Sequence, residues 1–395
     1  METVCLKRIE STLFCCYFAS WPSVDPRLSG QAMGAAAGVP KILILIFTET
    51  HLNAIGLNPQ HWDENFKLMN DLNLVQFSGA NFNIIGLYLD RPFTGVFNGS
   101  HKAILEFRYA APSLGHSFIG LFGAIRGNSA EIRNLGLIQP EIDVGIALWA
   151  GPLVGFNLEG VIANCYVIEG QVNGFANVGG LVGENSKGLI YRCYSTCQIP
   201  RGYNIGGLTG HNSGIIAESL AIGQVSGASK VGGLVGWNSY TGIIANSFSV
   251  STVVGSSRGI GGLVGFNSGW IQNSYSAGEV SAQLFVGGLI GCDLGDRVFS
   301  SFWNIETSGH MFSAGGIGFT AEQLVSLNSF QSYDWDFQAV WGICESITWP
   351  WLRNTGRPAD DSEPCPHQAI GQEDAVAQLL SHWLQEEELA TSIIS

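Results

Sequence analysis

Charged residues are scarce in this chain. Asp, Glu, Lys and Arg make up 13% of its 395 residues, about half of the roughly 25% found in an ordinary globular domain. Basic residues are scarcest, because 18 Lys and Arg face 32 Asp and Glu and leave a formal net charge of −14. Nucleic-acid binding needs a basic surface, so we expect no nucleic-acid partner. A hydrophobic content of 46% also excludes an intrinsically disordered chain.

Long apolar runs and the motifs of common catalytic sites are missing too. The longest apolar run, residues 42–47, is far shorter than the roughly 20 residues that cross a membrane, so we expect no membrane span. The sequence has no Cys-x-x-Cys and no His-Glu-x-x-His, and no Lys-Ser/Thr follows its glycine runs as in a phosphate loop. These absences favour a protein that is not an enzyme and holds no metal or cofactor.

Glycine is abundant instead, with 52 residues, and much of it lies in a repeat. Gly-Leu-Val-Gly or a close variant recurs at a spacing that settles near about 27 residues, which is the scale of a solenoid repeat. An element of the type Ile-x-Asn-Ser-Tyr-Ser follows each copy, and a single valine after a glycine comes next. The repeated leucines are Leu121, Leu153, Leu181, Leu208, Leu234, Leu263 and Leu289.

Three short apolar pieces per repeat, separated by Gly, Asn and Ser, predict three short β-strands joined by turns. One such unit cannot bury its apolar face alone, but stacked units can. We therefore predict an all-β fold: a parallel β-solenoid with one coil per repeat, successive coils about 4.8 Å apart and short capping helices at the ends.

An asparagine follows each Gly-Leu-Val-Gly after one variable residue. Asparagine side chains hydrogen-bond readily to nearby backbone, so stacked copies predict a structural ladder of turn amides at one corner. Its members are Asn157, Asn185, Asn212, Asn238, Asn267 and Asp293. Asp293 and Asp296 share a turn and are also the best candidates for the pair of carboxylates that a glycoside hydrolase needs.

These motifs resemble the GLUG repeats of bacterial secreted and surface proteins, which include adhesins and the non-catalytic part of some IgA-cleaving peptidases. The resemblance covers about residues 50–355 and includes flanking segments such as residues 93–99 and 335–337. It implies a right-handed parallel β-helix in an extracellular or cell-surface setting. It implies no known reaction.

The composition divides the chain into five segments. Residues 1–48 form a leader that either resembles a degenerate signal peptide or reflects a mis-assigned start. Residues 49–115 are predicted to be an N-terminal cap with the first coils, 116–305 the repeat solenoid, and 306–356 a C-terminal cap. Residues 357–395 form an acidic tail whose apolar spacing predicts an amphipathic helix. This helix either caps the solenoid or docks on a partner.

Two rows of side chains are candidates for contact with a ligand. Alternation from the preceding Ile predicts that the first row points inward, whereas a bend would turn it outward as a binding track. Its aromatic members are Tyr166, Tyr194, Phe248, Tyr275 and Phe302, with Leu135 and Leu220 in the remaining coils. The second row is the variable residue after Gly-Leu-Val-Gly, where Phe156, Trp237 and Phe266 are the predicted contact residues. It also holds Glu184, His211 and Cys292, and His211 is expected to be solvated at a turn.

Two pairs of residues are predicted to meet across neighbouring coils. Cys165 and Cys193 occupy a position that serine takes in later repeats. We interpret them as small side chains in a stacked row, with an inter-coil disulfide as the alternative in an oxidising compartment. Glu218 aligns with Arg192 one coil earlier and predicts a surface ion pair.

Together these features favour a non-catalytic extracellular or cell-surface solenoid that mediates adhesion or binding to a glycan or a surface protein. One alternative is a polysaccharide-acting hydrolase or lyase, which would require converging acidic side chains. Another is a structural spacer of a larger surface assembly, which would need no exposed aromatic row.

Overall fold

The computed structural model describes residues 41–87, 89–111 and 118–353. The chain divides into two units, Met1–Lys41 and Ile42–Ser395, and every described strand and helix lies in the second. The predicted helix of the acidic tail and nearly all of the predicted leader lie outside the described residues.

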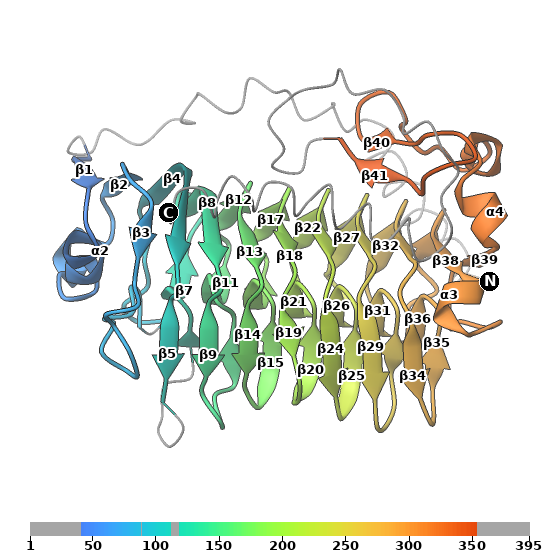
Figure 1. Ribbon diagram of the computed structural model, residues 1–395, viewed down its shortest axis with the longest axis horizontal. Helices are drawn as coiled ribbons and strands as arrows, with labels where there is room; N and C mark the ends of the chain where they lie inside the picture. Colours follow the sequence, from blue (N-terminus) through green and yellow to red (C-terminus); the bar gives the residue numbers. More distant parts are fainter. Residues whose placement is uncertain (1–40, 88, 112–117, 354–395) are drawn as a thin grey trace, which may run out of the picture. The chain divides into compact units, whose positions relative to one another are not determined.

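The second unit is built of parallel coils stacked on one another (Figure 1). Three of its sheets contain seven strands each and a fourth contains 18. Residues one repeat apart pair in register, as Asn185 does with Asn212. The prediction of an all-β parallel solenoid is confirmed.

From β10 (Trp149–Ala150) to β34 (Val280–Ala282), each coil contains five short strands where three were predicted. A representative coil runs through β15 (Ala176–Gly179), β16 (Val182–Ser186), β17 (Leu189–Tyr191), β18 (Tyr194–Ser195) and β19 (Gln198–Ile199). These strands belong in turn to the sheets that we number 1, 2, 4, 4 and 3. The additional strands arise because the glycine-leucine turn separates sheet 1 from sheet 2, and because a backbone bend divides the segment in sheet 4.

Each of these coils contributes one strand to each of sheets 1 to 3. Sheet 1 also contains β6 (Phe118–Ile119), β10 (Trp149–Ala150), β20 (Tyr203–Gly206), β25 (Ser229–Gly232), β30 (Ile260–Gly261) and β35 (Val286–Gly287). Sheet 2 also contains β7 (Phe122–Arg126), β11 (Val154–Leu158), β21 (Thr209–Asn212), β26 (Val235–Asn238), β31 (Val264–Asn267) and β36 (Ile290–Asp293). Sheet 3 also contains β5 (Arg108–Ala110), β9 (Glu141–Asp143), β14 (Gln171–Asn173), β24 (Gln224–Gly227), β29 (Thr252–Gly255) and β34 (Val280–Ala282).

Sheet 4 runs from the first described strand to the last coil. It also contains β1 (Leu43–Ile46), β2 (Asn65–Leu68), β3 (Leu72–Asn73), β4 (Val96–Leu105), β8 (Glu131–Ile138), β12 (Val161–Ala163), β13 (Tyr166–Ile168), β22 (Ile215–Ala217), β23 (Leu220–Ala221), β27 (Ile243–Ala245), β28 (Phe248–Ser249), β32 (Trp270–Gln272), β33 (Tyr275–Ser276), β37 (Val298–Phe299), β38 (Phe302–Asn304) and β39 (Ile317–Phe319).

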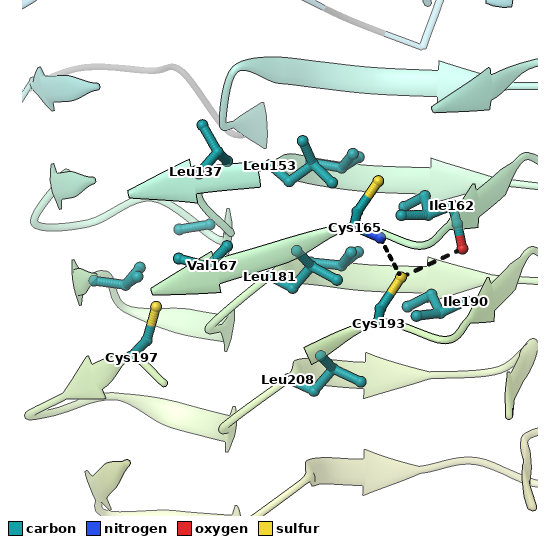
Figure 2. Packing of buried hydrophobic residues seen from close by; sticks show 14 of the residues in the cluster. Leu137, Leu153, Ile162, Cys165, Val167, Leu181, Ile190, Cys193, Cys197 and Leu208 are labelled. Atoms are coloured by element: carbon teal, nitrogen blue, oxygen red, sulfur yellow. Dashed lines mark hydrogen bonds between the residues drawn. The ribbon is translucent and has the colours of Figure 1, made fainter. Parts of the chain in front are cut away.

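The repeated leucines form a central row of the core. All seven are fully buried, and the Leu181 N–H donates to the Leu208 carbonyl of the next coil at 3.0 Å. Figure 2 shows Leu153, Leu181 and Leu208 stacked beside the buried isoleucines of sheet 4. Burial of one such side chain stabilises the fold by about 1.5–3 kcal/mol. Each repeat therefore adds one such contribution to the core.

The last glycine of Gly-Leu-Val-Gly lets sheets 1 and 2 approach closely. A Cβ on Gly210 would lie 2.4 Å from the backbone C of Asn177 and the N of Val178 in sheet 1. Gly236, one coil later, approaches Asn204 of its preceding coil in the same way, at 2.5 Å. No side chain fits between these backbones, which is why the repeat requires glycine here.

The asparagines after this glycine are buried and linked from coil to coil. Each amide Nδ2 donates to the Oδ1 of the next member at 2.8 or 2.9 Å, from Asn157 through Asn267. Asp293 accepts from Asn267 at 2.8 Å and also from the Gly295 N–H at 3.1 Å. One oxygen of this carboxylate therefore ends the ladder.

The cysteine and serine row forms a second ladder in the core. The Cys165 N–H donates to Cys193 Sγ at 3.4 Å, and the Cys193 N–H donates to Ser219 Oγ at 3.1 Å. The same link continues through the serines of later coils. Both cysteines are free buried thiols (Figure 2), so each takes the place of a serine hydroxyl and no disulfide joins them.

A left-handed residue bends the Ile-x-Asn-Ser element in every repeat. Asn246, for example, has φ of 48°, and this bend divides β27 from β28. Because the bend resets the alternation, Ser247 points into the solenoid core while Phe248 belongs to a separate apolar cluster outside it. The equivalent residues are Asn134, Asn164, Arg192, Glu218, Asn273 and Ser300.

The C-terminal segment turns back and covers the outward aromatic row. It contains α3 (Ile305–Ser308), α4 (Ala321–Leu324), the 3-10 helix η3 (Leu327–Phe330), and the antiparallel pair β40 (Trp341–Gly342) and β41 (Trp351–Leu352). Figure 1 shows β40 and β41 over the later coils. Tyr275 Oη donates to the Pro350 carbonyl at 2.6 Å, and the rings of Trp341 and Tyr275 lie 6.0 Å apart.

A helix covers the other end of the stack. In α2 (Glu49–Gly56), the N-cap Thr48 accepts from the His51 N–H, and Leu52 and Ile55 are buried in the solenoid core. The 3-10 helix η2 (Pro59–His61) follows, and Trp62 Nε1 donates to the Ile55 carbonyl at 2.8 Å. Short helices therefore occur at both ends, as predicted.

Candidate functional site

The outward row of sheet 4 is not an open binding track. Phe248 and Tyr275 are fully buried beneath the C-terminal segment, and Tyr194 is 6% exposed. Tyr166 and Tyr194 stack with ring centroids 5.1 Å apart. The structure therefore corrects the interpretation of Phe248 and Tyr275 as ligand contacts, because the chain's own tryptophans already occupy their outer faces.

Leu135 was also predicted to belong to that row, and in the structure it does not. Tyr166 pairs with Gly136 rather than with Leu135, and a Cβ on Gly136 would lie 2.2 Å from the Tyr166 ring. Leu135 directly follows the left-handed Asn134, as Cys165 follows Asn164, so it belongs to the inward row of the core and not to the aromatic row. Leu220 does belong to the row, between Tyr194 and Phe248.

The variable residues after Gly-Leu-Val-Gly form a continuous row on sheet 2. Strand register places them one above another from coil to coil. They lie within the strands of sheet 2, one residue before each member of the ladder, and not at a turn. In order, they are Phe156, Glu184, His211, Trp237, Phe266 and Cys292.

A second row, on sheet 1, lies beside the first. Its members precede their sheet 2 neighbours by seven residues, because the glycine-leucine turn folds the two strands together. The contacts join Trp149 to Phe156, Asn177 to Glu184, and Lys230 to Trp237. We call these two rows the two-row surface; its sheet 1 members are Trp149, Asn177, Asn204 and Lys230.

Glu184 is the polar centre of the two-row surface. Its Oε2 accepts from Trp149 Nε1 and, at 3.1 Å, from Asn177 Nδ2. Its Oε1 lies 3.2 Å from His211 Nδ1, and the two side chains are only 13% and 14% exposed. The expectation of a solvated turn His211 is therefore wrong, because the imidazole is held between the Glu184 carboxylate and the Trp237 ring.

The aromatic end of the surface carries a cation. Lys230 Nζ lies 3.7 Å from the ring centroid of Trp237 and 5.1 Å from that of Phe266. His211 stacks on Trp237 with centroids 4.6 Å apart. Burial lowers the pKa of the Lys230 ammonium, and the rings compensate part of the lost hydration through cation–π attraction.

The structure thus brings Trp237 and Phe266 together and separates them from Phe156 by Glu184 and His211. Sequence reasoning missed Trp149, Asn177 and Lys230. A comparison of each row residue with the residue seven positions earlier could have found them.

The predicted pair of Glu218 and Arg192 is confirmed, with Oε2 and Nε 2.8 Å apart. It lies on sheet 4, and Tyr191 Oη donates to the same carboxylate at 3.3 Å. Burial, and then the Glu218 charge, raise the pKa of Tyr191 to about 12. This cluster is separate from the two-row surface.

The described residues offer neither a membrane-spanning helix nor a metal cluster. No helix among them is long and apolar enough to cross a membrane. In the same part of the chain, no three His, Cys, Asp or Glu side chains are grouped as a metal site would require.

Comparisons with known proteins support the fold. No family model matches the chain. Over 116 residues it is 36% identical to a protein of Evansella cellulosilytica described as a "Putative Gly-rich membrane protein". That match covers 27% of this chain and 13% of the relative, so the chain spans only a small part of the relative's length.

A solved structure shares the architecture more widely. The crystal structure of "a putative immunoglobulin A1 protease from Bacteroides ovatus" superposes with a TM-score of 0.52 over 78% of this chain and 91% of that chain. The sequence identity is 20%, so the likeness shows the fold alone.

Proposed function

We propose that this protein is a non-catalytic binding module and that the two-row surface is where it contacts a glycan. The observation that supports the proposal is the cluster of Trp237, Phe266 and Lys230, in which large rings and a cation lie together on a strand face. Rigid rings provide contact area at low entropic cost, which is why aromatic residues are enriched in binding surfaces.

The parallel register explains how such a surface is built. Each coil adds one side chain to each row at a spacing of about 4.8 Å. A linear polymer can therefore contact several coils in succession, and its affinity can accumulate from individually weak contacts. The proposal favours an extended ligand over a small molecule.

A glycan array probed with the full chain tests this function. We expect selective binding that a Trp237→Ala, Phe266→Ala double variant weakens by about tenfold or more, equivalent to about 1.4 kcal/mol. Trp270→Ala, Phe299→Ala is the matched control, because these two rings stack 5.7 Å apart on sheet 4. The control should bind as the unaltered protein does.

Other outcomes point to the alternative functions. A folded protein that binds no glycan would contradict the proposal and favour a protein ligand or a structural spacer. Release of new reducing ends from a bound polysaccharide would contradict the non-catalytic part and favour a hydrolase, for which Asp293 and Asp296 would be the first residues to replace.

We also propose that the protein works outside the cell or on its surface. A capped β-solenoid with little charge is compatible with that setting, and a glycan-binding surface is useful there. Antibody labelling of intact cells checks this. Signal only after the cells are permeabilised would contradict it.

A further inference from the structure

Lys230 is a half-buried cation without an acidic partner among the described residues. The aromatic contacts to Trp237 and Phe266 offset only part of the cost, because a ring face offers less charge than a carboxylate. Such a cation is suited to meet an anion supplied by a ligand.

Two further nitrogens at the same place are also unused. His211 Nε2 and Trp237 Nε1 are buried and have no hydrogen-bond partner within the described part of the chain. A buried polar atom left unpaired costs about 1–3 kcal/mol. Indole Nε1 is a donor only, and the Lys230 ammonium has donors only. Both groups therefore call for acceptor oxygens on the missing partner, with His211 Nε2 available for a further hydrogen bond beside them.

Glu184 cannot be that partner. It already accepts from Trp149, Asn177 and His211. Its contact with His211 Nδ1 fixes the ring so that Nε2 is left for another group. The carboxylate thus positions the imidazole and leaves the ammonium of Lys230 without a counter-ion.

We propose that Lys230 and Trp237, beside His211, bind the carboxylate of an acidic sugar, so that the glycan recognised by this surface carries uronic or similar acid groups. The inference rests on the proposed glycan-binding function. Lys230 supplies the charge, Trp237 Nε1 donates a directed hydrogen bond to the carboxylate, His211 Nε2 pairs with a sugar hydroxyl, and Phe266 borders the sugar ring. Both ring nitrogens are covered in the structure, so we expect the flexible Lys230 side chain to move when the ligand binds.

Calorimetric titration with a matched pair of probes tests the proposal. One probe is a galacturonic acid tetrasaccharide, and the other is its carboxyl-reduced form, in which each sugar residue has lost its charge and one oxygen. We expect the acidic form to bind about tenfold tighter or more, as a charge-assisted contact provides. Added salt should weaken that preference by screening.

The variant Lys230→Met removes the charge but keeps most of the apolar stem. It should abolish the preference for the acidic probe, whereas Lys187→Met, at an exposed lysine of an earlier coil, should keep it. Equal binding of the two probes, or an unchanged preference in Lys230→Met, would overturn the proposal.

The result also separates this inference from the proposed function. Equal binding of the two probes that is lost in the Trp237→Ala, Phe266→Ala protein would leave glycan binding intact and refute only the acidic sugar. Equally tight binding of a poly-glutamate peptide would refute the sugar and assign the carboxylate to a protein.

Discussion

Single residues of the ladders fix the register of this solenoid. Asn212 accepts from Asn185 and donates to Asn238, and all three are fully buried. Asn212→Leu would remove the acceptor of the Asn185 Nδ2 and Gly214 N–H donors and the donor to Asn238 Oδ1, so we expect a loss of about 2–5 kcal/mol in unfolding free energy. The midpoint of guanidinium-induced unfolding measures this loss.

Thr241→Ala is the control for this prediction, because it removes one exposed hydrogen bond, from Oγ1 to the Ser213 carbonyl. An Asn212→Leu protein that unfolds at the same midpoint as this control would show that the ladder contributes nothing beyond packing.

Cys197 makes the unfolding free energy depend on pH in the alkaline range. Burial raises the pKa of its thiol to about 12, against about 8.5 in an unfolded chain. The folded state holds the thiol proton more tightly than the unfolded state does. The stabilisation that results is complete below about pH 8.5 and is lost as pH rises toward 12. At pH 10.5 the loss should be about 2–3 kcal/mol.

Cys197→Ser isolates that contribution, since Ser251 makes the equivalent bond to a glycine carbonyl two coils later. Denaturation midpoints between pH 8 and 10.5, under reducing conditions, should fall more steeply for the unaltered protein. Parallel pH profiles for the two proteins would contradict the assignment.

At the scale of elements, the sequence predicted the repeat and its stacking but not the direction of the aromatic row. Strict alternation from Ile244 would turn Phe248 inward, and only the left-handed Asn246 turns it outward. Asparagine tolerates this conformation, but Arg192 and Glu218 occupy the same position. The bend is therefore imposed by stacking on neighbouring coils, which a single repeat does not show.

The candidate site was predicted only in part for a similar reason. Trp237 and Phe266 could be found as neighbours in a repeat alignment, because register depends on repeat length. The pairing of Lys230 with Trp237 depends on the close approach of sheets 1 and 2 at each glycine. Two residues that face each other across a turn belong to different strands, so the alternation of residues within one strand does not reveal that they meet.

The C-terminal segment, which covers the aromatic row, should be able to loosen without unfolding the coils. Trp341 is fully buried between Phe248, Tyr275 and Trp335, so Trp341→Ala should cost about 3–5 kcal/mol of local packing. Hydrogen exchange should accelerate in residues 319–352 and in β28 and β33, and stay unchanged in β16 and β21.

Tyr240→Ala, at a tyrosine that is 66% exposed, should change neither set of exchange rates. Uniform acceleration through all coils of the Trp341→Ala protein would instead show that the cover and the solenoid unfold as one cooperative unit.

At the scale of the whole molecule, a solenoid is a sum of coils and neighbour contacts. Removal of one complete coil should therefore leave a folded, shorter stack. Deletion of residues 211–236 joins Gly210 directly to Trp237 and continues the ladder from Asn185 to Asn238. It removes His211 and Lys230, so we expect a folded protein by circular dichroism that has lost its glycan binding.

Deletion of residues 156–183 is the matched test, because it removes another complete coil and joins Gly155 to Glu184. It keeps His211, Lys230, Trp237 and Phe266 in their mutual register, and affinity should remain within about threefold because distant coils contribute independently. If both shortened proteins fold and lose binding equally, the ligand must span the whole stack. Binding retained only when residues 211–236 are removed would place the site away from His211 and Lys230.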